Sequence, residues 1–304
     1  MRNIIYKILI IAFTLTFVVS GIVIGRQLYQ KHKAMTEYDE ISTKLDELIA
    51  YYEAQRLGTS TQDGETADAQ NSPGNQGNGA DSNGSSDLDN SAGTNNGTDD
   101  QTVAQGAEQT DPRLLAYRDM NAEYPDFIGW IRIADTQLDY PVMQTPRVPE
   151  YYLSRNYNRQ KSGHGTPFLD AACDINRPSD NMIIYGHNMN DGTMFATLNK
   201  YKDYEFFEQH PLIEFHTLNE IGIYEVVAAF IGDFTAAPDS IFYYNHFSNF
   251  YNEDEFDSFI ENVRTRSIYD MSVTLSYGDQ LLTLSTCEYT TYESRMVVLA
   301  RRIT

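Results

Sequence analysis

The sequence is poor in cysteine and in basic residues, and each scarcity excludes a class of protein. Its 304 residues include two cysteines, Cys173 and Cys287, too few for the disulfide framework of many small secreted domains. Lysine and arginine number 22 against 43 acidic residues, and no basic stripe stands out of the kind that binds a polyanion. The composition therefore excludes a disulfide scaffold and predicts no nucleic-acid partner.

Residues 58–111 lack aromatic side chains, lysine and arginine altogether, and ten of them are acidic. A segment of this composition cannot bury enough apolar surface to fold. A calcium loop between Asp87 and Asp100 is the alternative, but the glycines miss the EF-hand position and no glutamate closes the loop. We predict a disordered acidic linker over residues 58–111 that serves as a flexible tether.

Residues 8–25 carry no charge, and as a helix they would span about 27 Å, which just crosses a bilayer. A cleaved signal peptide is the competing interpretation, but its apolar region is usually only ~7–15 residues long. We therefore predict that residues 1–33 form an uncleaved, single-pass membrane anchor with its flanks.

The next segment, residues 34–57, has apolar side chains at alternating steps of three and four, as one face of a helix requires. We predict a juxtamembrane helix that acts as a spacer, with dimerisation as a minority possibility because two heptads are short for a coiled coil. The residues of this face are Tyr38, Ile41, Leu45, Leu48 and Tyr52.

Residues 112–304 hold most of the aromatic residues, and we predict that they form one domain around a single core. Helical patterns cover residues 193–202 and 253–266, and Asp111-Pro112 is a plausible start for a helix through residue 121. Short apolar runs recur often enough to predict a closed or nearly closed β-barrel. They cover residues 128–134, 138–144, 166–171, 182–187, 212–216, 221–232, 272–276, 281–287 and 296–303.

Three chemically active residues stand at the ends of these runs. Cys287 closes the alternating run in TLSTCEY, and Arg295 opens the following run, RMVVLARRI. Antiparallel pairing of the two runs would bring Arg295 beside Cys287. His187 ends a much earlier run, residues 182–187, and follows Gly186, which permits a close backbone approach. We expect all three at the rim of the barrel, where catalytic groups tend to lie.

These residue types suit covalent acyl transfer. A cysteine thiol titrates near ~8.5, so it needs a base or a cation to become a nucleophilic thiolate at neutral pH. His187 can exchange protons, and Arg295 can stabilise an oxyanion. Taken singly, each residue has an ordinary structural interpretation. A metal site needs three or four ligands, and neither CxxC nor HxxxH spacing occurs near these positions, so we expect no metal and no cofactor.

The motifs resemble those of the sortases, the cysteine transpeptidases of Gram-positive cell surfaces, and class B among them. TLSTC followed by RMVV is similar to the sortase signature, and IIYGHNMNDGTMFATLNKY is similar to the class B histidine segment. The resemblance runs from about Pro125 to the C-terminus. It implies a mainly β fold, an eight-stranded barrel with N-terminal helices and a long helix inserted before the penultimate strand.

The resemblance also assigns roles. It implies that Cys287 is the nucleophile, His187 the acid/base and Arg295 the oxyanion-stabilising or substrate-orienting cation. Ser285, Glu288 and Tyr185 would lie beside the bound peptide, in a groove framed by an insertion over residues 237–267. Cys173 has no expected catalytic role, and we treat His164, His210, His216 and His246 as ordinary polar residues.

The implied reaction cleaves the C-terminal sorting motif of a surface protein after threonine, through a thioester, and passes the acyl group to a peptidoglycan-precursor or pilin amine. The catalytic domain would lie outside the cell. Two alternatives stay open. One is a hydrolytic cysteine protease that uses the same histidine and cysteine, although the order of the two residues matches poorly with known protease families. The other is a non-enzymatic surface scaffold.

Overall fold

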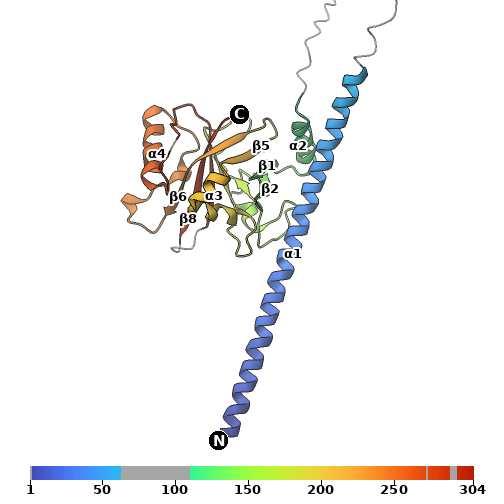
Figure 1. The fold of residues 1–304 in the computed structure, drawn as a ribbon, viewed down its shortest axis with the longest axis vertical. Coiled ribbons are helices and arrows are strands. Elements are labelled where there is room, and N and C mark those ends of the chain that lie inside the picture. The colour runs from blue at the N-terminus through green and yellow to red at the C-terminus, as the bar shows by residue number, and fades with distance from the viewer. Residues whose placement is uncertain (1, 63–109, 272, 288–292) are drawn as a thin grey trace, which may run out of the picture.

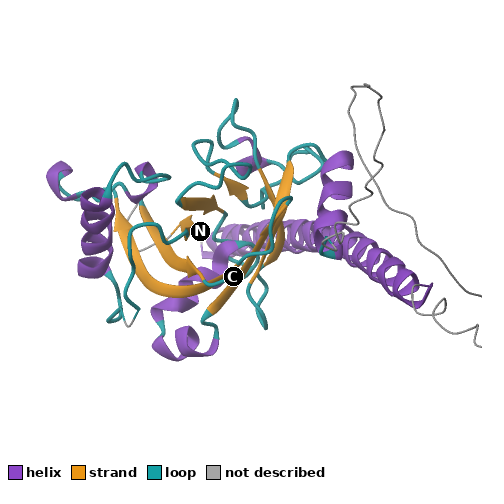
Figure 2. Ribbon diagram, turned by 90° about the horizontal axis from the view of Figure 1, so that it is seen from above, coloured by secondary structure: helices purple, strands orange, loops and turns teal. Residues whose placement is uncertain are grey.

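The computed structural model describes residues 2–62, 110–271, 273–287 and 293–304. Within these residues, eight strands close into a barrel in the order β1-β2-β3-β4-β7-β8-β6-β5, which confirms the predicted barrel (Figures 1 and 2). The strands are β1 Phe127–Arg132, β2 Asp139–Met143, β3 Phe168–Leu169, β4 Asn181–Tyr185, β5 Leu212–Thr217, β6 Ile223–Asp233, β7 Leu281–Cys287 and β8 Ser294–Arg302.

The pairing of β4, β7 and β8 decides which residues meet. Strand β4 is parallel to β7, with Tyr185 opposite Ser285, and β7 is antiparallel to β8, with Cys287 opposite Arg295. The ends of β4 and β7 and the start of β8 therefore lie at one end of the barrel. A parallel pair needs a long crossover connection. The connection from β4 to β7 contains β5, β6 and the longest helix of the domain.

That helix, α4 (Glu253–Arg266), packs on the outside of the barrel and precedes the penultimate strand, as expected. Asn252 caps it by accepting a hydrogen bond from the backbone N–H of Glu255 at 2.9 Å. Acidic residues fill its first turn and basic residues its last, which suits the helix dipole. Its apolar face joins β6 and β8 in a second core, made of residues that include Phe230, Phe256, Phe259, Ile260, Val263, Val297 and Leu299.

One predicted strand is wrong. Residues 273–276 form no strand, and the chain turns at once, with Ser276 N–H bonded to the carboxylate of Asp279 at 2.8 Å. Val273 and Leu275 instead pack against the second core. Their alternation with polar residues therefore reflects burial beside α4 and not pairing in a sheet.

The shorter helices are close to the predictions. The helix expected to start at Asp111-Pro112 is α2 (Pro112–Glu123), capped by the Asp111 side chain. The pattern at residues 193–202 gives a 3-10 helix, η2 (Phe195–Lys202), in place of an α-helix. The remaining elements are η1 Tyr151–Ser154, α3 Tyr204–Gln209, η3 Pro238–Ser240 and η4 Tyr244–His246.

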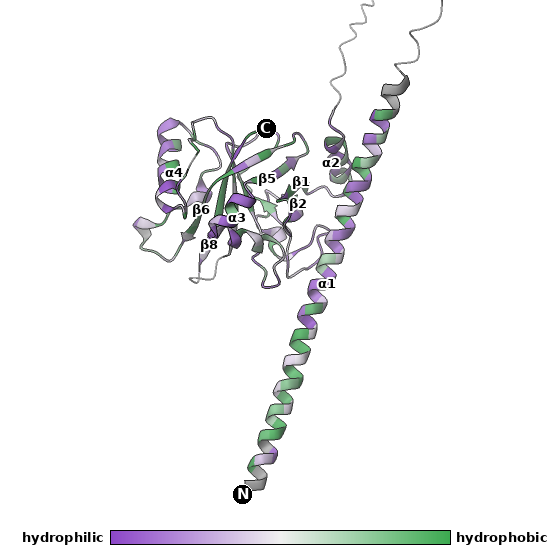
Figure 3. Cartoon of the chain, in the orientation of Figure 1, coloured by the Kyte–Doolittle hydropathy of each residue, from purple (hydrophilic) through white to green (hydrophobic). Residues whose placement is uncertain are grey.

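Helix α1 (Arg2–Gln62) is a single long helix whose apolar N-terminal half projects away from the domain (Figures 1 and 3). By length and composition it could cross a membrane, and that apolar part is not buried. Its second half lies against the domain on the side opposite α4 (Figure 2). There Tyr38, Ile41 and Leu45 are buried in the main core. The helix predicted as a spacer is therefore packed on the barrel.

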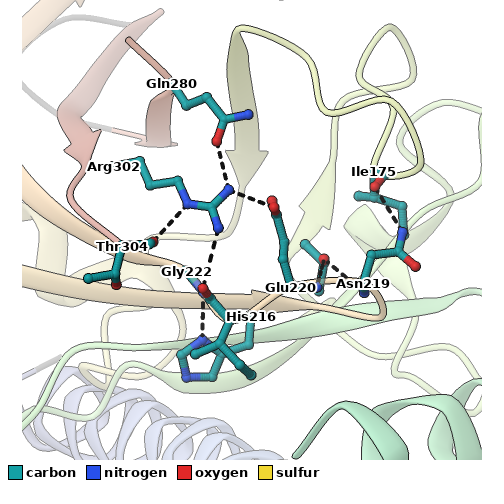
Figure 4. Close-up of polar contacts among 10 residues, drawn as sticks. Ile175, His216, Asn219, Glu220, Gly222, Gln280, Arg302 and Thr304 are labelled. Carbon is teal, nitrogen blue, oxygen red and sulfur yellow. Dashed lines mark hydrogen bonds and ion pairs between the residues drawn. The ribbon is translucent and has the colours of Figure 1, made fainter. Parts of the chain in front are cut away.

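At the end of the barrel away from Arg295, the side chain of Arg302 joins the C-terminus to the segments that lead into β6 and β7 (Figure 4). Its guanidinium donates to Glu220 at 2.6 Å and to Gln280 at 2.7 Å, and its Nε donates to the carbonyl of Thr304 at 2.7 Å. In Figure 1 the C-terminus lies at the end of the domain away from the N-terminus of α1. The other end of β8, where Arg295 lies, therefore faces the side on which α1 projects.

Candidate active site

The backbone at the rim joins the three strand ends that carry the expected catalytic residues. Gly186 donates its N–H to the carbonyl of Ser285 at 3.2 Å, and the hydroxyl of Thr286 donates a hydrogen bond to the carbonyl of Gly186 at 2.7 Å. Since Cys287 follows Thr286 and pairs with Arg295, these bonds fix the backbones of all three segments relative to one another. The side chain of Cys287, and Glu288 as a whole, lie outside the described residues.

A cavity of about 620 Å³ opens at this end of the barrel. His187 and Arg295 both line it, as do Tyr185 and Ser285, so four of the six expected site residues share one cavity. The rest of its wall includes apolar and acidic side chains, among them Leu153, Phe168, Glu150 and Asp170. A concave, largely apolar site with a few convergent polar groups is typical of a site that binds a peptide or a small molecule.

The ring of His187 is oriented by a backbone carbonyl. Its Nε2 lies 2.6 Å from the carbonyl oxygen of Leu153, and because a carbonyl can only accept, Nε2 carries the hydrogen of this bond. In the neutral ring Nδ1 is then the basic nitrogen. Sequence reasoning missed Leu153, because a carbonyl that orients a ring across 34 residues leaves no side-chain signature.

Gly186 is required by a close contact. A Cβ at this position would lie 2.6 to 2.9 Å from three ring carbons of Phe195, which is fully buried. Phe195 also donates its N–H to the carbonyl of His187 at 2.9 Å. The small residue expected before His187 thus lets the ring of Phe195 pack under the histidine segment.

Tyr185 is bound to an acidic partner that the sequence did not indicate. Its hydroxyl donates to Asp170 at 2.8 Å. Burial and the nearby carboxylate of Asp170 raise the pKa of Tyr185 well above its ordinary value. Tyr185 therefore stays a neutral hydrogen-bond donor at any physiological pH, half-buried in the cavity wall.

Helix η4 supplies two further wall residues, Tyr244 and Asn245. The hydroxyl of Tyr244 lies 2.7 Å from Oγ of Ser285. Oδ1 of Asn245 is buried and has no hydrogen-bond partner among the described residues. Both belong to the insertion over residues 237–267 that we expected to frame the groove, but the sequence did not indicate which of its residues would face the cavity.

Cys173, the second cysteine, is buried and not in a disulfide. Its thiol donates to the carbonyl of Asn181 at 3.4 Å, and burial raises its pKa to about 12. At neutral pH its thiol is therefore protonated, which is the unreactive form of a cysteine.

No group of three or more histidine, cysteine, aspartate or glutamate side chains in the described residues is arranged to hold a metal ion. Among the described residues, the ionisable groups that line the cavity are the guanidinium of Arg295, the imidazole of His187 and the carboxylates of Glu150 and Asp170. Such an arrangement can exchange a proton and stabilise a developing negative charge.

Comparison with known proteins agrees with this architecture. A family model described as the sortase domain matches residues 131–303. Sortase B of Listeria monocytogenes is 35% identical over 189 residues, which cover 62% of this chain and 74% of that protein. Sortase B of Staphylococcus aureus is 32% identical over 180 residues, covering 59% of this chain and 70% of that protein.

Among solved structures, the Staphylococcus aureus sortase B-substrate complex superposes with a TM-score of 0.57 and 28% identity, over 62% of this chain and 85% of that chain. The closed barrel with a helix before its penultimate strand is thus shared with a class of cysteine transpeptidases of the cell surface. The chain belongs to the sortase family, and its similarity is to class B.

Proposed function

We propose that this chain is a membrane-anchored class B-type sortase in which Cys287 attacks the carbonyl of a threonine in the C-terminal sorting motif of a surface protein. The attack forms a thioester and releases the remainder of the C-terminus. A peptidoglycan-precursor or pilin amine then attacks the thioester and takes the acyl group. Residues 112–304 would be the catalytic domain, outside the cell. The predicted linker over residues 58–111 would join it to the helix that carries the anchor, although α1 continues through the first five of these residues, to Gln62.

The observation that carries this proposal is the strand register. Cys287 lies opposite Arg295, and the hydrogen bond from Thr286 to Gly186 ties the same strand end to the segment of His187. A nucleophile, an acid/base and a fixed cation on adjoining strand ends are the groups that acyl transfer requires.

His187 would protonate the leaving amine and deprotonate the incoming one, because the two half-reactions are the reverse of each other. The basic nitrogen for both steps would be Nδ1, since Nε2 is committed to the carbonyl of Leu153. Arg295 would bind the carbonyl oxygen of the substrate as it gains charge, or orient the peptide beside it.

Ser285, Tyr185 and Glu288 would contact the peptide. Ser285 and Tyr185 line the cavity, and each hydroxyl already bonds to a protein group. We propose that the two residues shape the site and that each hydroxyl oxygen can still accept a hydrogen bond from the peptide. Asn245 is a further candidate, because a buried and unpartnered amide oxygen can accept a hydrogen bond from a peptide N–H.

The test uses purified protein, a fluorogenic peptide with a sorting motif ending in threonine-glycine or threonine-asparagine, and an added amine such as triglycine or a lysine peptide. We expect wild type to give a mass-spectrometric adduct of peptide and amine, and Cys287→Ala to give neither adduct nor cleavage. Cleavage without an adduct would indicate a protease instead. Cleavage by Cys287→Ala at the wild-type rate would overturn the proposal.

A further inference from the structure

Helix α1 makes a buried contact with the loop that orients His187. Tyr38 on this helix is 3% exposed, and its hydroxyl donates to the carbonyl of Gly165 and lies 3.0 Å from Oγ1 of Thr166. Rings of Tyr140 and Tyr157 surround it at centroid distances of 5.2 and 6.1 Å. A buried hydroxyl with two partners fixes the position of the backbone that it binds.

That backbone in turn supports helix η1, which carries Leu153. Thr166 donates its N–H to the carbonyl of Tyr152 at 3.0 Å. Gly165 has a φ of +60°, and a Cβ there would lie 2.7 Å from the carbonyl oxygen of Tyr152 and 2.8 Å from that of Leu153. The segment therefore lies directly against the carbonyl group that accepts the hydrogen bond of His187.

A second contact joins α1 to the segment that follows His187. Lys31 donates to the carbonyl of Asp191 at 2.8 Å, in the loop that follows His187. The carboxylate of Asp191 lies 3.0 Å from Nε2 of His164, which immediately precedes Gly165. Helix α1 thus contacts both segments that flank His187, the one that carries it and the one that orients it.

We propose that Tyr38 is a positioning residue for His187, acting from helix α1 through Gly165, Thr166 and the carbonyl of Leu153. This inference rests on the proposed role of His187 as the acid/base. Its consequence is that the helix leading to the membrane is part of the catalytic unit, although about fifty residues of linker separate the two along the chain.

The physical reason lies in the geometry of the hydrogen bond at Nε2. A carbonyl acceptor holds the ring in one tautomer and stabilises the imidazolium that forms when the ring takes a proton. Hydrogen bonds weaken steeply with misalignment, so a small displacement of Leu153 would misdirect Nδ1 and destabilise the imidazolium. The effect would fall on proton transfer more than on peptide binding.

The experiment compares Tyr38→Phe with Tyr52→Phe in the full-length chain in detergent micelles. Tyr52 is the matched control, since it lies on the same helix and its hydroxyl donates at 2.5 Å to Asp119, on α2 and away from the site. Both substitutions remove one hydroxyl and keep the ring. Transpeptidation kinetics and the pH profile of Cys287 alkylation by iodoacetamide are measured for each, with melting curves to confirm folding.

For Tyr38→Phe we expect kcat to fall roughly tenfold, as a small misplacement of a catalytic group can cause, with KM within about twofold of wild type. The alkylation profile should move to higher pH, because the imidazolium that stabilises the thiolate is weakened. Tyr52→Phe should leave both readouts unchanged.

Thr166→Val provides a second variant from the barrel side, should Tyr38→Phe not fold. In the double variant the loss should be smaller than the sum of the two single losses, because the two substitutions share the contact between the hydroxyls of Tyr38 and Thr166. Suppose that wild type forms amine adducts, and that both Tyr38→Phe and Thr166→Val match wild type in kcat and in pH profile. The inference is then wrong, and the proposed function stands. If wild type forms no adduct with any amine, the proposed function fails and this inference falls with it.

Discussion

The hydroxyl groups of Ser285 and Tyr244 lie 2.7 Å apart in a buried contact between strand β7 and helix η4. Ser285 is 1% exposed and comes two residues before Cys287, whereas Tyr244 lies in helix η4, in the part of the insertion that precedes α4. The pair therefore ties the wall of the cavity to the strand that carries the proposed nucleophile. It also gives Ser285 a structural role beside its proposed contact with the peptide.

Removing either hydroxyl of this pair should lower the stability of the folded protein. We expect Ser285→Ala to lower the free energy of unfolding by about 1–2 kcal/mol, because it leaves the buried hydroxyl of Tyr244 without this partner. Tyr244→Phe removes the other hydroxyl. The double variant should cost less than the sum of the two single changes. Chemical denaturation of the four proteins checks the coupling, and additive losses would show that the pair is not a unit.

Gly186→Ala should reduce stability and activity at once. The new methyl group would overlap the buried ring of Phe195, and overpacking of this kind typically costs ~1–3 kcal/mol. Because His187 follows directly, we expect transpeptidation at a temperature well below unfolding to fall more than the folded fraction does. Gly163→Ala is the matched control, since a Cβ there meets nothing within 4 Å. Equal activity of the two variants would contradict the prediction.

The two cysteines should differ sharply in reactivity. Burial raises the pKa of Cys173 to about 12, so at pH 7–8 almost none of it is thiolate, and iodoacetamide should label Cys287 first. Peptide mapping by mass spectrometry after short exposure checks this, with Cys173→Ala as the variant in which the label should persist and Cys287→Ala as the one in which it should vanish. Label on Cys173 in the folded protein would contradict the assignment.

The cap of α2 should contribute a pH-dependent part of the stability. The hydrogen bond from Arg113 is the main cause that lowers the pKa of Asp111 below its ordinary value of 3.8. A carboxyl with a lowered pKa in the folded state stabilises the protein above its unfolded pKa, and this contribution is lost as pH falls through the folded pKa. We therefore expect the contribution to be complete at neutral pH, to begin to fall at about pH 4, and to be lost as the pH falls through the lowered pKa of the folded state.

Asp111→Ala should cost about 1 kcal/mol at pH 7, as the loss of a helix cap typically does. Asp111→Asn keeps a capping oxygen without the charge, so it should retain much of the cap but lose the dependence on pH. Urea denaturation at several pH values separates the contribution of the capping hydrogen bond from that of the charge of Asp111. A constant difference between wild type and Asp111→Asn from pH 3 to pH 7 would contradict the expected titration.

Local pattern was enough to predict most elements that position the site. The alternation that ends in Cys287 and the run that opens with Arg295 form the predicted antiparallel pair, and the apolar face of residues 253–266 forms the predicted helix. These predictions succeed because strand and helix periodicity report directly on which side chains are buried. The pattern at residues 272–276 misled for the same reason, since Leu275 is buried and Val273 is partly buried against the second core without pairing in a sheet.

The partners of the site residues could not be predicted in this way. Leu153 orients His187 through a carbonyl group, Asp170 bonds to the hydroxyl of Tyr185 on β4, and Tyr244 bonds to the hydroxyl of Ser285 on β7. Each of these contacts joins segments with no shared periodicity, and a backbone carbonyl has the same chemistry in every residue. Only the closure of the barrel brings them together.

The sequence by itself determined the order of strands and helices, the apolar N-terminal segment and the three residues with acyl-transfer chemistry, because burial patterns and reactive side chains are properties of local sequence. The tertiary structure alone decided that β4 runs parallel to β7, that His187 donates to the carbonyl of Leu153 and that Tyr38 lies in the core. These relationships depend on long-range packing, in which segments far apart along the chain are held together by the free energy of burying their shared surfaces.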